Sequence, residues 1–98
     1  MNINFLNHLF RTIEKKAKSK DPQSYTRLLL KGGKNKIAQK VGEESSELII
    51  DYLNGSKKRT IEEAADLIYH LFVLLYSKKI TLNDVKKELT KRENVRPK

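Results

Sequence analysis

Two long stretches of the chain carry apolar residues at intervals of three and four positions, which is the spacing of one face of an α-helix. The first stretch begins near Lys34 and is terminated by Asn54-Gly55, and the second runs from about Thr60 to Ser77. Strand-like alternation of apolar and polar residues is absent from the whole sequence. We therefore expect an all-α fold whose centre is an antiparallel helical hairpin.

The beginning of the second long helix is predicted from a capping pattern. Thr60 can accept a hydrogen bond at the helix N-terminus, and Glu63 stands three residues later, as in a capping box. This pattern places the turn of the hairpin over residues 55–59. The helix that follows is apolar around most of its circumference between Ile61 and Leu75, so we expect it to be buried on several sides.

Short helices are expected on both sides of the hairpin. The apolar spacing from Phe5 to Ile13 predicts a first helix that ends near Lys18, and a short helical piece follows over residues 24–30. Thr81 and Asp84 predict the start of a final short helix. The expected architecture is one domain over residues 1–98, with the hairpin forming a dimeric arrangement like a four-helix bundle.

Composition excludes several classes of function. The 98 residues include no cysteine, which rules out disulfides and thiolate metal sites and fits a reducing compartment such as the cytoplasm. No apolar run approaches the length of about 18 residues that spans a bilayer, and the N-terminus does not resemble a secretory signal. The net charge of +9 leaves a basic helical nucleic-acid-binding dimer as a less favoured alternative, because Lys and Arg are spread along the chain.

Acidic residues are concentrated in the hairpin, although the chain as a whole is basic. Seven of the twelve carboxylates lie between Glu43 and Asp66. Glu44 occupies a position where the helical pattern calls for an apolar residue, and such a substitution in a core position needs a reason. Positions three apart share a helix face, so Glu44 projects with Glu47, and Glu63 projects with Asp66. Antiparallel packing can then bring both pairs to one level of the hairpin.

Four carboxylates at one level repel one another unless a divalent cation binds between them. A ligand set made only of oxygen selects hard ions, so we expect Mg²⁺, with Mn²⁺ as an alternative. Magnesium commonly bridges substrate phosphates, which implies hydrolysis or transfer at phosphorus. The alternative interpretation is a solvated acidic face neutralised by Lys40, Lys58 and Arg59, which stand three or four residues before four of the acids. That alternative leaves Glu47 and Asp66 without partners.

Other residues near the acids are candidates for binding the substrate. Lysines precede the acidic helix, and among them Lys40 and Lys36 are candidates for holding a triphosphate, with Lys40 favoured because it lies one helical turn from Glu44. His70 follows Asp66 by one turn, so it can support the site from behind the ligands, although a lone histidine is more often a hydrogen-bonded core residue.

The acidic pattern Glu-Glu-x-x-Glu followed by Glu-x-x-Asp resembles the signature of the MazG-like all-α nucleoside triphosphate pyrophosphatases. Three further motifs make the resemblance more specific, and they point to the phosphoribosyl-ATP pyrophosphatase family over nearly the whole chain. These motifs are Ser24-Tyr25-Thr26, Lys40-Val41-Gly42-Glu43-Glu44 and Ala65-Asp66-Leu67-x-Tyr69-His70-Leu71.

The resemblance implies an activity and a set of roles. It implies hydrolysis of the α-β phosphoanhydride of phosphoribosyl-ATP in histidine biosynthesis by a magnesium-dependent homodimer, with a related enzyme acting on ordinary nucleoside triphosphates as the alternative. It carries Tyr25 and Thr26 over as substrate-binding residues and Glu43 as a residue that either activates water or supports the ligands. The ligands that it implies are Glu44, Glu47, Glu63 and Asp66.

Overall fold

The structure of the protein, a computed structural model, describes residues 3–93. Within these residues every regular element is an α-helix, which confirms the all-α fold expected from the apolar spacing. The helices are α1 (Ile3–Ala17), α2 (Tyr25–Gly32), α3 (Lys34–Asn54), α4 (Lys57–Ser77) and α5 (Leu82–Lys91).

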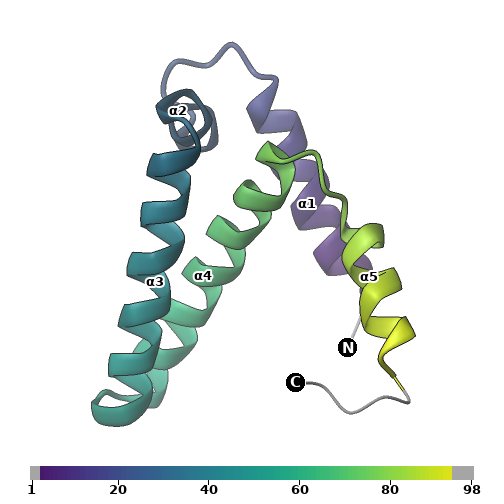
Figure 1. The fold of residues 1–98 in the computed structure, drawn as a ribbon. Helices are drawn as coiled ribbons and strands as arrows, with labels where there is room; N and C mark the ends of the chain where they lie inside the picture. The colour runs from purple at the N-terminus through teal and green to yellow at the C-terminus, as the bar shows by residue number, and fades with distance from the viewer. Residues whose placement is uncertain (1–2, 94–98) are drawn as a thin grey trace.

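Helices α3 and α4 form the predicted antiparallel hairpin and make the most extensive helix-to-helix contact in the described part of the chain (Figure 1). The connection between them is only Gly55 and Ser56. A Cβ atom at Gly55 would lie 2.9 Å from the Cα atom of Asp51, closer than side chains approach backbone. Glycine at this position therefore permits the tight return of the chain.

The N-terminus of α4 differs from the sequence prediction. Ser56 is the cap, and its hydroxyl oxygen accepts a 3.1 Å hydrogen bond from the backbone N–H of Arg59. Thr60 lies inside the helix, where its hydroxyl donates to the Ser56 carbonyl at 2.9 Å. The predicted Thr60 capping box and the five-residue turn are therefore wrong. Serine caps as well as threonine does, and starting at Ser56 brings Lys57, Lys58 and Arg59 into the helix with their backbone hydrogen bonds.

The caps of the short helices follow their sequences closely. Ser24 accepts a 3.3 Å hydrogen bond from the Arg27 N–H at the start of α2. Thr81 and Asp84 form the predicted capping box of α5, with reciprocal bonds of 3.1 and 2.9 Å. Gly33 separates α2 from α3 with φ = 88°, a conformation that glycine adopts without strain.

The core lies where α1 and α2 meet the end of the hairpin remote from its turn. Figure 1 shows α1 against the upper part of α4, with α5 beyond it. The rings of Phe10 and Phe72 are tilted against each other with their centroids 5.5 Å apart. The buried apolar residues are Phe10, Ile13, Leu29, Ile37, Phe72 and Val73. The core thus fixes one end of α3 and α4, and their acidic stretch extends from it toward the turn.

The hairpin beyond this core is less covered than the sequence predicts. Ile61, Ile68 and Leu71 of α4 are 60%, 40% and 39% exposed, so α4 is not buried on all sides within a single chain. Tyr52, on the predicted apolar stripe of α3, is 75% exposed. The reason is that α1 and α2 reach only the upper part of the hairpin. None of the described helices combines the length and apolar character needed to cross a membrane.

The complete burial of Ile13 yields a stability prediction, because this side chain belongs to the core that holds α1 against the hairpin. We expect Ile13→Val to lower the free energy of unfolding by roughly 1 kcal/mol and Ile13→Ala by roughly 2 to 5 kcal/mol. Urea unfolding at a fixed protein concentration measures both. Arg11→Ala, at an exposed position of the same helix, is the control and should change stability by less than about 0.5 kcal/mol. Equal effects of Ile13→Ala and Arg11→Ala would contradict this account of the core.

Candidate metal centre

Three of the four predicted ligands converge between the two long helices. Glu44 comes from α3, and Glu63 and Asp66 come from α4. One carboxylate oxygen of each lies within 4.8 Å of the others, a spacing at which a single cation could contact all three. The helical offsets of three residues and the antiparallel pairing therefore place these acids as the sequence predicts.

Two of these carboxylates are buried with an oxygen atom that has no partner. Glu44 is 8% exposed and Glu63 is 3% exposed, and the Oε2 atom of each accepts no hydrogen bond from any residue that the structure describes. A buried anionic oxygen without a partner is costly, because it loses its water without gaining another donor. A divalent cation is a partner that would satisfy both oxygens at once.

Glu63 is the most electrostatically perturbed acid of the site. Its burial, followed by the interaction with the neighbouring carboxylate of Glu47, raises its pKa from the usual 4.5 to about 7, and the charge of Arg59 offsets part of this rise. The contact with Glu63 also shows where the fourth predicted ligand lies. Glu47 is exposed and stands beside Glu63, outside the closest group of three.

Arg59 connects the site to the turn of the hairpin. Its Nη2 atom lies 2.7 Å from Oε1 of Glu63, its Nη1 atom lies 2.9 Å from Oε1 of Glu62, and its Nε atom lies 4.0 Å from Oδ2 of Asp51. The pairs of Arg59 with Glu62 and Glu63 are those that the alternative interpretation expected, but Glu63 is buried and does not belong to a solvated face. No ion pair involves Glu47 or Asp66 within residues 3–93, as the spacing predicts.

Lys40 is the basic residue on the α3 side of the site. Its Nζ atom lies 3.5 Å from Oε1 of Glu43 and 3.7 Å from Oε1 of Glu44. Burial lowers the pKa of Lys40, but the neighbouring Tyr25, Glu43 and Glu44 outweigh this effect and raise it overall, so the ammonium group stays charged. Glu43 itself is half exposed. Lys36 forms no ion pair with the acids in the described part of the chain.

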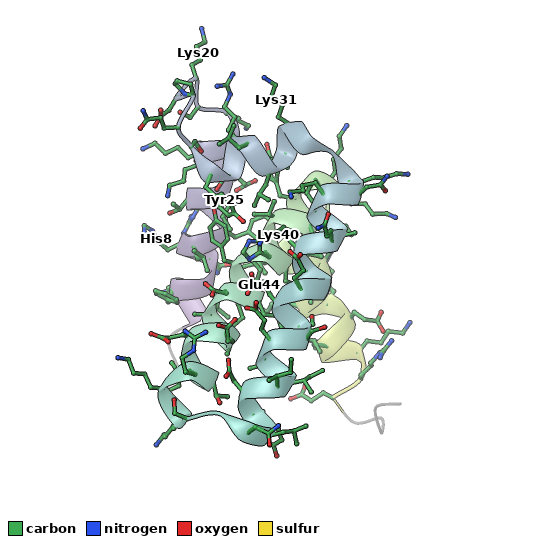
Figure 2. The ribbon with its side chains drawn as sticks, turned by 90° about the vertical axis from the view of Figure 1, so that its left-hand side faces the viewer. His8, Lys20, Tyr25, Lys31, Lys40 and Glu44 are labelled. Carbon is green, nitrogen blue, oxygen red and sulfur yellow. The ribbon has the colours of Figure 1, made fainter. Side chains whose placement is uncertain are left out.

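Tyr25 and His70 link α2 to the acidic group. The Nδ1 atom of His70 lies 2.7 Å from the backbone carbonyl oxygen of Asp66, and its Nε2 atom lies 2.8 Å from the Tyr25 hydroxyl. Since a carbonyl only accepts, Nδ1 carries the proton of the neutral ring and the Tyr25 hydroxyl donates to Nε2. Burial, partly offset by Lys40, raises the pKa of Tyr25, so this hydroxyl keeps its proton. Figure 2 shows Tyr25, Lys40 and Glu44 following one another on the same side of the molecule.

Thr26 lies in the interior and not at the surface of the site. It has no exposed area, and its hydroxyl is hydrogen-bonded to that of Tyr69. The ring of Tyr69 stacks on that of Tyr25, with centroids 6.2 Å apart. Sequence reasoning did not single out Tyr69, although its place beside His70 within one motif was a signal that could have found it.

Comparison with known proteins shows the family of the chain. A family model described as "Phosphoribosyl-ATP pyrophosphohydrolase" matches residues 6–93, which include every candidate site residue. The chain belongs to this family. A protein of Bacillus cereus (strain AH820) named "Phosphoribosyl-ATP pyrophosphatase" is 44% identical over 84 residues, covering 86% of this chain and 78% of the relative, and a Bacillus anthracis protein of the same name matches equally well.

A longer relative of the family contains a similar segment. The "Histidine biosynthesis bifunctional protein HisIE" of Bacteroides thetaiotaomicron is 46% identical over 92 residues, covering 94% of this chain and 45% of the relative. Family membership confirms the resemblance found in the acidic and Ser-Tyr-Thr motifs.

The pKa of Glu63 predicts how stability depends on pH without divalent cations. Between about pH 4.5 and pH 7 the folded protein holds a proton on Glu63 that the unfolded chain has lost, so this group makes stability fall as pH rises through that interval. We expect Glu63→Gln, which mimics the protonated form, to melt like the wild type near pH 5. Near pH 8 it should melt at a higher temperature. Thermal melts with a chelator present measure the difference.

Glu88→Gln in α5 is the control for this experiment. The hydrogen bond from Arg92, followed by its charge, lowers the pKa of Glu88, so the stability that this pair contributes is lost only as pH falls below the usual range of a glutamate. The effect of Glu88→Gln should therefore stay constant between pH 5 and pH 8. A constant difference between Glu63→Gln and the wild type over the same interval would contradict the raised pKa.

Proposed function

We propose that the protein hydrolyses the α-β phosphoanhydride of phosphoribosyl-ATP, giving phosphoribosyl-AMP and pyrophosphate in the second step of histidine biosynthesis. The family match and the names of the similar proteins support this substrate. The observation that carries the chemistry is the convergence of Asp66 with two buried carboxylates, Glu44 and Glu63, each with a partnerless oxygen. Such a group suits a reaction that brings a cation and a polyphosphate together.

Magnesium is the cofactor that fits these donors. Glu44, Glu47, Glu63 and Asp66 are the proposed ligands, and all of them offer oxygen, the donor that Mg²⁺ prefers. When bound, the ion would offset the charge of the triphosphate and polarise its phosphorus–oxygen bonds. Glu47 is proposed as a ligand because it lies near enough to Glu63 to raise the pKa of that carboxyl group.

Glu43 is the proposed base for the attacking water. It is half exposed and lies next to Glu44, so it can accept a proton from a water molecule beside the ligands. The water oxygen forms a new bond to phosphorus as the anhydride P–O bond breaks, and pyrophosphate leaves with the electrons of that bond. The proton on Glu43 then passes to solvent.

Basic and aromatic residues next to the acids are proposed to hold the substrate. Lys40 is charged and partly buried beside Glu44, which suits contact with a phosphate oxygen, and Lys36 lies one turn earlier on α3. Tyr25 is proposed to border the substrate, held in orientation by His70. We propose that Thr26 contributes indirectly, by fixing α2 through its hydrogen bond to Tyr69.

A homodimer is the proposed assembly. The hairpin exposes apolar side chains that a second copy would bury in a four-helix arrangement, and a contiguous exposed apolar surface typically marks an interface. The cytoplasm is the proposed compartment, in keeping with a chain that has no cysteine. The exposed apolar residues of α3 and α4 are Ile49, Ile50, Tyr52, Leu53, Ile61, Ile68 and Leu71.

Pyrophosphate release from a panel of nucleotides tests the proposed substrate. With Mg²⁺ present, phosphoribosyl-ATP should be hydrolysed with a far higher kcat/KM than ATP, GTP or the deoxynucleoside triphosphates. A preference for ordinary triphosphates would instead indicate the related MazG-like activity.

Replacing single ligands tests the proposed site. Glu44→Gln and Asp66→Asn should each lower kcat/KM by roughly 100-fold or more, because they remove charge that holds the cation. Glu88→Gln, an exposed acid of α5, should leave the activity unchanged. Wild-type rates in both ligand variants would refute the metal site.

Light scattering after size-exclusion chromatography tests the dimer. The wild type should have twice the mass of the 11.4 kDa chain. Ile61 and Ile68 are seven residues apart and share one face of α4, so Ile61→Lys combined with Ile68→Lys should shift the protein toward the monomer. Leu89→Lys, at a position of α5 that is 65% exposed, is the control and should not change the mass. A wild-type protein with the mass of one chain would refute the proposal.

A further inference from the structure

We propose that Arg59 is a built-in substitute for the charge of the cation, which stabilises the metal-free protein and weakens cation binding. This inference rests on the proposed function, because it assumes that Glu63 is a metal ligand. It concerns a residue to which neither the sequence motifs nor the family match assigns a role.

The geometry places the guanidinium against the most buried carboxylate of the site. The Arg59 side chain is 55% exposed, whereas that of Glu63 is only 4% exposed. The guanidinium group of Arg59 therefore lies at the solvent-exposed edge of the site and contacts a carboxylate in its interior. The bond of 2.7 Å uses Oε1 of Glu63 and leaves Oε2 without a partner. Arg59 thus offsets part of the negative charge of Glu63. It does not bond Oε2, so this oxygen stays available to a metal ion.

Two further acids keep the guanidinium at this position. Glu62 binds Nη1 at 2.9 Å, and Asp51 of the neighbouring helix lies 4.0 Å from Nε. Neither belongs to the group of three that could hold the cation. Arg59 therefore has anchors that do not depend on Glu63, and it stays near the site when a cation binds there.

A retained guanidinium repels an incoming divalent cation, since both positive charges act on Glu63. The same charge stabilises the metal-free site by reducing the repulsion among Glu44, Glu47 and Glu63. The stabilisation of the metal-free protein and the weaker binding of the cation are linked. Any interaction that stabilises the metal-free state more than the metal-bound state lowers the affinity for the metal by the same free energy. Lys40 is a weaker substitute, since its Nζ atom is 3.7 Å from Glu44 and lies closer to Glu43.

Arg59 could instead act only by orienting Glu63 for the metal. Hydrogen-bond partners of metal ligands usually raise affinity, and their removal weakens binding by 10- to 100-fold. The two roles therefore predict opposite signs for the loss of the charge. A measurement of affinity separates them, which a measurement of activity alone would not do.

Isothermal titration calorimetry with Mn²⁺ and with Mg²⁺, without substrate, is the test. Arg59→Gln removes the charge but keeps a hydrogen-bond donor, and we expect it to bind the cation about tenfold more tightly than the wild type. Arg59→Lys keeps the charge and should bind like the wild type. Lys58→Gln makes the same change of net charge at the adjacent, exposed position and should alter the affinity by less than about twofold.

Thermal melts supply a second measurement. With a chelator, Arg59→Gln should melt below the wild type, and saturating Mg²⁺ should stabilise it more than it stabilises the wild type. Arg59→Met, which keeps the aliphatic stem, is a second neutral variant in case the glutamine variant folds poorly.

The outcomes distinguish this inference from the proposed function. Binding by Arg59→Gln and Arg59→Met that is equal to or weaker than that of the wild type overturns the role of Arg59 and leaves the metal site standing. A wild type that binds neither Mn²⁺ nor Mg²⁺ overturns the metal site and the role of Arg59 together.

Discussion

Two carboxylates buried between antiparallel helices are the constraint on which the rest of this structure depends. Glu44 and Glu63 lie with Asp66 inside a group only a few ångströms across, and each buried acid has an oxygen without a partner. Burial, followed by the neighbouring carboxylate of Glu47, raises the pKa of Glu63, and such a place favours any cation that can approach. Lys40 of α3 and Arg59 of α4 neutralise part of this negative charge. The charge that they leave uncompensated is the reason why we propose a divalent ion at this site.

The hydrophobic core and the acidic group are mechanically connected through α2. The core holds α1 and α2 against one end of the hairpin, while Tyr25 and Thr26 at the start of α2 bond to His70 and Tyr69 of α4. His70 in turn bonds to the backbone of Asp66. Packing of the core, far from the turn, therefore sets the positions of the Tyr25 and Tyr69 rings beside the acids.

Sequence reasoning succeeded where local rules decide and failed where two local rules compete. Apolar spacing located all five helices, and Thr81 with Asp84 formed the predicted capping box. At the start of α4, Thr60 was the expected cap, but Ser56 is of a residue type that caps at least as well, and the chain uses this earlier residue. That single difference places Arg59 within the helix, three and four residues before Glu62 and Glu63, where its side chain reaches both.

By itself, the sequence determined that the chain is helical, that two acidic pairs would share the hairpin, and that the motif belongs to a known family. Those properties depend on spacing along one helix, which residue order fixes directly. Only the tertiary structure decided which oxygens converge, that Glu63 loses its water and titrates near neutral pH, and that Tyr25 meets His70. Such properties depend on distances between different helices and on the exclusion of water, and packing alone sets both.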